Sequence, residues 1–156
     1  MNSILPGVYQ GSMESLKHLK QYKITHVITL CPTYVNLESY ISHLDIPISD
    51  WGPISRKQLE ECYDFIDECV KNRGNVLIHC FAGMNRSVSV TAAYLMYKLD
   101  LDWDTALCVI KKTCPIADPS EELKIYILRY FEKLNFPVKE SCASVMNEVN
   151  GAKLNS

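Results

Sequence analysis

The feature that most constrains this chain is a β-leaning run, a short polar loop and a helix-favouring run in immediate succession. The first run is Asn75-Val76-Leu77-Ile78, and the last extends from Ser87 to about residue 99. Between them stands His79-Cys80-Phe81-Ala82-Gly83-Met84-Asn85-Arg86, in which five residues separate the cysteine from the arginine. A strand, a tight loop and a helix start direct backbone N–H groups and the positive end of the helix dipole at one point. The stretch therefore predicts a cradle for an anion such as phosphate.

The residue types in this loop are suited to phosphoryl transfer. Cys80 lies at its base, where the same field favours the thiolate, which is the nucleophilic form. Arg86 offers a planar fork for two phosphate oxygens, and Gly83 permits a turn that a side chain would obstruct. Ser87 can donate a hydrogen bond to the sulfur when it must leave. We interpret the loop as a site of phosphate-monoester hydrolysis through a phosphocysteine, with a buried structural thiol as the alternative for Cys80.

Residues 79–87 resemble the signature of the cysteine-based protein phosphatases, His-Cys-x-x-Gly-x-x-Arg-Ser/Thr, and Ala93-Tyr94-Leu95-Met96 is similar to the helix of their dual-specificity branch. The resemblance covers residues 4 to about 134. It implies that phosphotyrosine and phosphoserine/phosphothreonine of proteins are the substrates, and that no cofactor is needed. The phosphate-binding loop is expected to comprise Phe81, Ala82, Gly83, Met84, Asn85 and Arg86. Within it, Phe81, Ala82, Met84 and Asn85 should mainly give backbone N–H groups, with their side chains at the rim of the mouth.

A phosphocysteine forms readily only when the leaving oxygen is protonated, so a carboxylic acid should face the loop. We predict Asp50, thirty residues before Cys80 on a turn-rich segment after a strand. Relatives of this branch carry their acid at about this interval. Asp45 is the competitor, but it lies within a strand pattern. An ordinary turn aspartate is the alternative for Asp50.

Two further residues, His79 and Ser120, are expected to support the loop, and two cysteines near the site also need an interpretation. His79 should face inward and hydrogen-bond loop carbonyls, with a merely packed histidine as the alternative. Ser120 stands where relatives have an asparagine that braces the loop, and Cys114 stands where they often have an arginine that can hold a second substrate anion. Cys31 resembles a resolving cysteine that forms a reversible disulfide with the nucleophile, and a buried thiol at a strand end is its alternative.

Interleaved strands and helices predict an α/β fold: a central, mostly parallel sheet of four to five strands flanked by helices, with the phosphate loop between the central strand and a helix. Strands are expected within residues 4–11, 26–30, 44–48 and 75–78. Helices are expected after Ser12, near residues 37–41, after a Ser55–Gln58 capping box, and over 87–99, 103–113 and 121–134. Residues 1–136 should form the catalytic domain, and residues 137–156 a flexible tail.

Composition narrows the environment. A net charge of −2 gives no general attraction to nucleic acid or anionic membranes. The first residues lack a signal-peptide core, and Asn2 stands where myristoylation needs glycine, so no membrane anchor is expected. Seven irregularly spaced cysteines suggest no disulfide framework, and four histidines without ligand spacing suggest no metal site. A reducing cytoplasmic or nuclear location follows.

Alternative functions stay open. A catalytically silent relative would bind phosphoproteins without turnover, but such proteins generally lose the cysteine or the arginine. A phosphoinositide substrate is disfavoured because no lysine lies between Cys80 and Arg86. An RNA 5′-phosphatase is not supported by the acidic charge balance.

Overall fold

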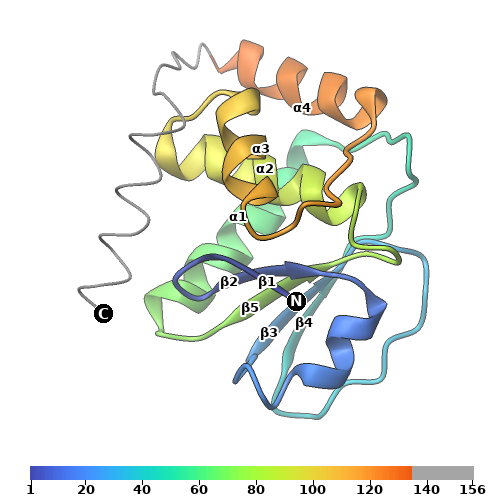
Figure 1. Ribbon diagram of the computed structural model, residues 1–156, viewed down its shortest axis with the longest axis vertical. Helices are drawn as coiled ribbons and strands as arrows, with labels where there is room; N and C mark the ends of the chain where they lie inside the picture. The colour runs from blue at the N-terminus through green and yellow to red at the C-terminus, as the bar shows by residue number, and fades with distance from the viewer. Residues whose placement is uncertain (135–156) are drawn as a thin grey trace.

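The computed structural model describes residues 1–134 as a five-stranded sheet covered by helices (Figure 1). The strands are β1 (Asn2–Leu5), β2 (Val8–Gly11), β3 (His26–Thr29), β4 (Ser42–Asp45) and β5 (Val76–His79), in the order β1-β2-β5-β3-β4. Only β1 pairs antiparallel. The predicted α/β fold, with a mostly parallel sheet and the phosphate loop after the central strand, is confirmed. Residues 137–156, predicted to be a flexible tail, lie outside the described residues.

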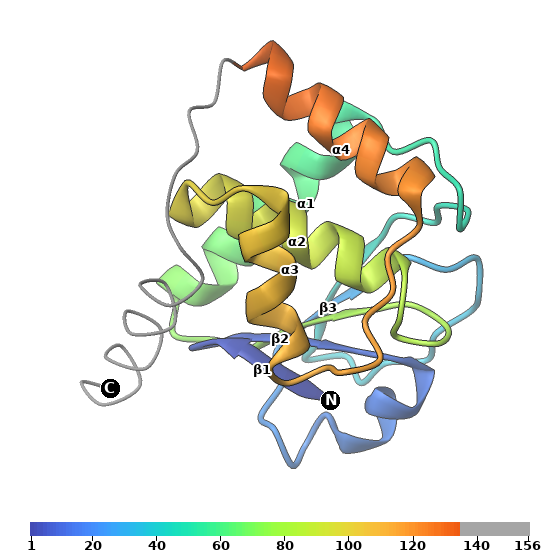
Figure 2. The ribbon, with the colours of Figure 1, turned by 45° about the horizontal axis from the view of Figure 1, so that its top comes forward.

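The four α-helices are α1 (Arg56–Lys71), α2 (Arg86–Leu99), α3 (Trp103–Lys111) and α4 (Glu121–Lys133). All four lie on one side of the sheet, and the 3₁₀ helix η1 (Met13–His18) lies on the other (Figures 1 and 2). The predicted capping box is present, since Ser55 Oγ accepts from the Gln58 N–H and the Gln58 amide accepts from the Ser55 N–H. Asp102 caps α3 by accepting the Thr105 N–H, and Ser120 caps α4 by accepting the Leu123 N–H. In the described residues no helix is long and apolar enough to cross a bilayer.

The central strand is buried on both faces, as a strand inside a parallel sheet should be. Val76 and Ile78 belong to the larger core beneath the α-helices, and Leu77 belongs to a smaller core on the η1 side. No residue of β5 is exposed. The loop that follows β5 therefore starts from a rigid anchor.

The structure differs from the local predictions in three stretches. No helix forms near residues 37–41, where Leu37 and Ile41 reach the smaller core from an irregular backbone. The turn and short strand expected within residues 4–11 are present as Pro6-Gly7 and β2, but a further strand, β1, precedes them and completes a hairpin. The strand expected over 44–48 runs from Ser42 to Asp45, and beyond it the N–H groups of Ile46 and Ile48 still donate to the Thr29 and Leu30 carbonyls. At residues 37–41, packing of Leu37 and Ile41 in the smaller core outweighs their helical spacing.

Candidate active site

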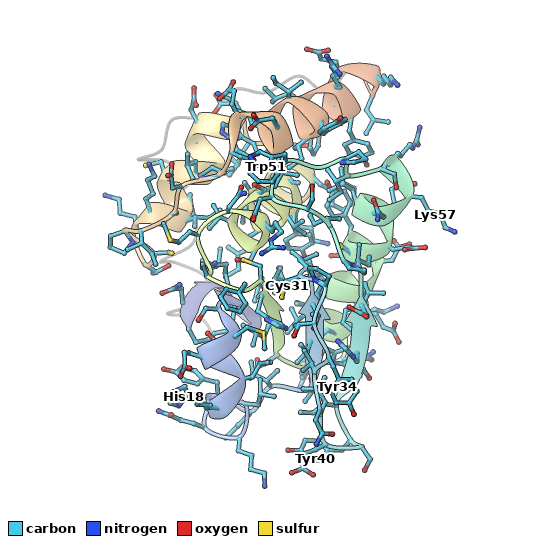
Figure 3. All side chains as sticks on the ribbon, turned by 90° about the vertical axis from the view of Figure 1, so that its right-hand side faces the viewer. His18, Cys31, Tyr34, Tyr40, Trp51 and Lys57 are labelled. Carbon is cyan, nitrogen blue, oxygen red and sulfur yellow. The ribbon has the colours of Figure 1, made fainter. Side chains whose placement is uncertain are left out.

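The loop of residues 80–86, here called the phosphate loop, follows β5 at the carboxyl edge of the sheet. Figure 3 looks onto this side of the molecule, with Trp51 beside α4 and Cys31 below it, toward the sheet. Cys80 is only 1% exposed. Its Sγ accepts the Gly83 N–H at 3.3 Å and lies 3.2 Å from Ser87 Oγ. The structure thus brings the predicted nucleophile and the predicted hydroxyl donor into contact.

The turn of the loop depends on Gly83 and on a residue that the sequence did not reveal. Gly83 has φ +72°, and a Cβ there would come within 3.0 Å of the backbone of Gly11 and Ser12. Gln10, fully buried in β2, donates from Nε2 to the Gly83 carbonyl and to Ser87 Oγ, both at 2.8 Å. Because Ser87 Oγ accepts from Gln10, its own proton is available to the Cys80 sulfur.

Arg86 opens α2 and lies in the wall of the loop, 9% exposed. Its Nη1 donates to the Ile48 carbonyl at 3.2 Å. Its Nε lies 3.1 Å from Asp50 Oδ1, yet this buried N–H has no hydrogen-bond partner among residues 1–134. The contact is therefore an ion pair without directional bonding. A buried guanidinium N–H without a hydrogen-bond partner is suited to donate to a bound anion.

The side chain of Asn85 joins the phosphate loop to the predicted acid. Its Nδ2 donates to the Asp50 carbonyl at 2.9 Å and to Asp50 Oδ1 at 3.2 Å, and its Oδ1 accepts from the Ser120 N–H at 2.7 Å. Ser120 Oγ donates to the same Asp50 carbonyl at 2.8 Å. The prediction that Asn85 would contribute mainly its backbone is therefore wrong. Ser120 does contact this network, as expected.

His79 is buried and faces inward, but its hydrogen-bond partner differs from the predicted one. Its Nε2 lies 2.8 Å from Thr29 Oγ1, which in turn lies 2.8 Å from His43 Nε2. Within the described part of the chain Nδ1 has no partner, so the expected bonds to loop carbonyls are not formed. Burial lowers the pKa of His79 to about 4, and the nearby Cys80 backbone offsets part of that depression. The imidazole is therefore neutral near pH 7.

Two buried free thiols lie near the nucleophile. Cys31 follows β3, the neighbour of β5, and burial raises its pKa. Cys114 stands where relatives often have an arginine, and its Sγ lies 3.8 Å from the Gly83 carbonyl oxygen. A disulfide between Cys31 and Cys80 stays a prediction.

The rim of the site is exposed and largely apolar. Phe81 and Met84 project from the phosphate loop, and Trp51 projects from the segment that carries Asp50. No group of three or more His, Cys, Asp or Glu side chains that could hold a metal occurs within residues 1–134. The arrangement can bind a phosphate ester, attack it with sulfur and offer one carboxyl group to the leaving oxygen.

Residues 8–133 match the family described as the dual specificity phosphatase catalytic domain. The chain belongs to this family. It is 40% identical over 121 residues to human dual specificity protein phosphatase 15, covering 75% of this chain and 41% of that protein. It is 32% identical over 119 residues to dual specificity protein phosphatase 1 of Arabidopsis thaliana, covering 73% of this chain and 60% of that protein.

Solved structures of dual specificity phosphatases agree with this membership. The crystal structure of DUSP15 superposes with a TM-score of 0.75 at 34% identity, covering 90% of this chain and 98% of that one. Human DUSP28 superposes with a TM-score of 0.79 at 21% identity, a likeness of fold alone. The chain spans about half or less of the curated dual specificity protein phosphatase 15 proteins that it matches.

Proposed function

We propose that this chain hydrolyses phosphate monoesters on tyrosine and on serine or threonine of proteins, through a phosphocysteine at Cys80. The observation that carries the proposal is the surroundings of the Cys80 sulfur. It accepts a backbone N–H, lies in contact with a hydroxyl oriented by Gln10, and shares its loop with an arginine whose Nε–H is unsatisfied. Family membership supports the same reaction class.

In the first step the phosphate oxygens bind the loop N–H groups and the Arg86 fork, and the ion pair between Arg86 and Asp50 opens. The Cys80 thiolate then attacks phosphorus. The P–O bond to the substrate breaks, and Asp50 gives its proton to the leaving oxygen. Because Asn85 holds both the carbonyl and the carboxylate of Asp50, the acid stays at the loop after Arg86 has turned to phosphate.

In the second step the Asp50 carboxylate takes a proton from water while the water oxygen attacks phosphorus. The S–P bond breaks, and Ser87 donates a hydrogen bond to the departing sulfur. The products are inorganic phosphate and the regenerated thiolate. The exposed rim residues Phe81, Met84 and Trp51 are proposed to contact the phosphorylated protein. Five free thiols in the described residues support a reducing compartment, for which we propose the cytoplasm or nucleus.

The test is turnover of a small aryl phosphate across pH, with reductant and a metal chelator present. The wild type should turn over without metal and show a bell-shaped pH profile. Cys80→Ser should abolish the reaction. Cys62→Ser is the matched control, because Cys62 is equally buried and its pKa is raised to about 12 by that burial. Activity that survives in Cys80→Ser, or that requires a divalent metal, would refute the mechanism. Folded wild type without turnover would favour a phosphoprotein-binding module.

A further inference from the structure

A groove between α4 and the start of α1 gathers positive side chains. Its volume is about 290 Å³. It contains no acidic residue among its lining, which consists of Ile54, Arg56, Tyr126, Arg129, Tyr130 and Lys133. We call it the cationic groove.

Two of the three cations in this groove are uncompensated. Arg56 Nε pairs with Glu60 Oε1 at 2.7 Å. Neither Arg129 nor Lys133 forms an ion pair with any of residues 1–134. They stand four apart on α4, a spacing at which like charges destabilise a helix. Although the chain has a net charge of −2, these two unpaired cations make one helix face locally positive, and such a face would attract an anionic partner.

The cationic groove is connected to the catalytic machinery through the segment that carries the acid. The Tyr126 ring packs on Gly52, where an added Cβ would lie 2.8 Å from two ring carbons, and Gly52 is two residues from Asp50. Ser120, the N-cap of α4, donates to the Asp50 carbonyl. Figure 3 shows Trp51 of this segment beside α4, and Lys57 at the start of α1 on the same side of the molecule.

The length of α4 sets the reach between the two sites. Nine residues separate Ser120 from Arg129, which is about 14 Å along the helix at a rise of ~1.5 Å per residue. An extended peptide covers that distance in about four residues. Because the Ser120 N–H bonds to Asn85 of the phosphate loop, a peptide with its phosphate in that loop and running along α4 needs about four extended residues to come near Arg129.

We propose that the cationic groove binds an acidic segment of the substrate protein, about three to six residues from the phosphorylated residue. This inference rests on the proposed phosphatase function. Aspartate or glutamate carboxylates would pair with Arg129 and Lys133, while the exposed Tyr126 ring would contact the apolar part of the peptide.

Two phosphotyrosyl peptides test the proposal, identical except for glutamate or glutamine at the positions three to six residues from the phosphotyrosine. For the wild type, kcat/KM should favour the glutamate peptide about fivefold, through KM. Arg129→Glu and Lys133→Glu should each remove that preference and leave turnover of a small aryl phosphate unchanged. The matched control is Lys71→Glu, which also reverses a lysine at the last residue of a helix, and it should keep the preference. High salt should weaken the preference in the wild type.

Equal kcat/KM for the two peptides in the wild type, or a preference that survives in both groove variants, would overturn the proposal. Binding of the labelled phosphopeptides to Cys80→Ser, followed by fluorescence anisotropy, tests the groove without turnover. A chain that hydrolyses nothing but binds the glutamate peptide more tightly would refute the phosphatase function and keep the groove. Binding to phosphatidylserine vesicles that Lys133→Glu abolishes, without any peptide preference, would assign the groove to a membrane surface and refute the proposal.

Discussion

Replacing Asn85 by alanine should uncouple the acid from the phosphate loop. The substitution removes two hydrogen bonds to Asp50 and one from the Ser120 N–H. It leaves the loop backbone in place, together with the bond from Ser120 Oγ to the Asp50 carbonyl. Asp50 would then keep only the hydrogen bond from Ser120 Oγ among its three bonds to Asn85 and Ser120. Its carboxylate would keep the ion pair with Arg86 but would lose its hydrogen bond from the phosphate loop.

The size of the effect follows from these contacts. A net hydrogen bond contributes about 0.5–1.5 kcal/mol, so three lost bonds should lower the free energy of unfolding by about 1.5–4.5 kcal/mol. A positioned general acid contributes about 10²–10⁴-fold to the rate. Since one tether to the acid survives, we expect kcat to fall by about ten- to a hundredfold on substrates that need the acid.

The assay is kcat/KM for aryl phosphates whose leaving phenols span several pKa units. Good leaving groups depart without a proton, so Asn85→Ala should affect them least and poor leaving groups most. Asp50→Ala should show the same steepening more strongly. Asn75→Ala is the matched control, because the Asn75 Nδ2 likewise donates two hydrogen bonds, to the carbonyls of Tyr22 and Lys23, at the opposite end of β5.

Asn75→Ala should lose stability but keep the leaving-group dependence of the wild type. If Asn85→Ala lowers the rate equally for good and poor leaving groups, it acts on phosphate binding instead of on the acid. That result would refute the role assigned here to the bridge between Asn85 and Asp50.

Further predictions concern the loop and its surroundings. Gly83→Ala should lower the free energy of unfolding by about 1–3 kcal/mol and remove most of kcat, because φ is positive and the new Cβ would lie 3.0 Å from the backbone of Gly11 and Ser12. Unfolding and turnover that both stay at wild-type levels would contradict this. Burial lowers the pKa of His79 from 6.5 to about 4, so between these pH values the unfolded chain binds a proton at His79 and the folded chain does not. The free energy of unfolding should fall by about 3 kcal/mol between pH 6.5 and pH 4, and His79→Gln should remove that share in denaturant titrations; an unchanged pH dependence would contradict the assignment. Peroxide should convert Cys80 to a sulfenic acid that condenses with Cys31 and releases water, and peptide mapping that finds a sulfinic Cys80 beside a free Cys31 would refute the pairing.

The parts of the site predicted from residue patterns alone are local ones, whereas Asp50 and Ser120 were predicted with the help of the family resemblance. The strand, loop and helix around Cys80 lie within one continuous stretch, and a Ser–Gln capping box or an Asp102 cap needs only neighbours three residues away. Periodicity and cap chemistry therefore sufficed for them. The short helix expected near residues 37–41 shows the limit of that approach, because Leu37 and Ile41 have helical spacing but are held by the smaller core.

The parts that the sequence did not reveal are contacts between distant residues. Gln10 contacts Gly83, 73 residues away in sequence, because β2 pairs with β5. The sequence pattern of residues 8–11 does not indicate that one of them is a buried amide. Asn85 meets Asp50 and Ser120, each 35 residues away, because the acid segment and the start of α4 converge on the loop. Such polar networks depend on strand order and helix placement, which local preferences do not specify.

The central claim is that the phosphoryl group passes through the sulfur of Cys80. The most direct measurement is acid quenching of the protein during turnover of an aryl phosphate, followed by peptide mass spectrometry. The account predicts that the peptide containing Cys80 gains one phosphoryl group on sulfur in the wild type, and that Asp50→Ala, which slows the attack of water, alters how much of it accumulates. Phosphoryl found on another residue, or none on Cys80 while turnover proceeds, would contradict it.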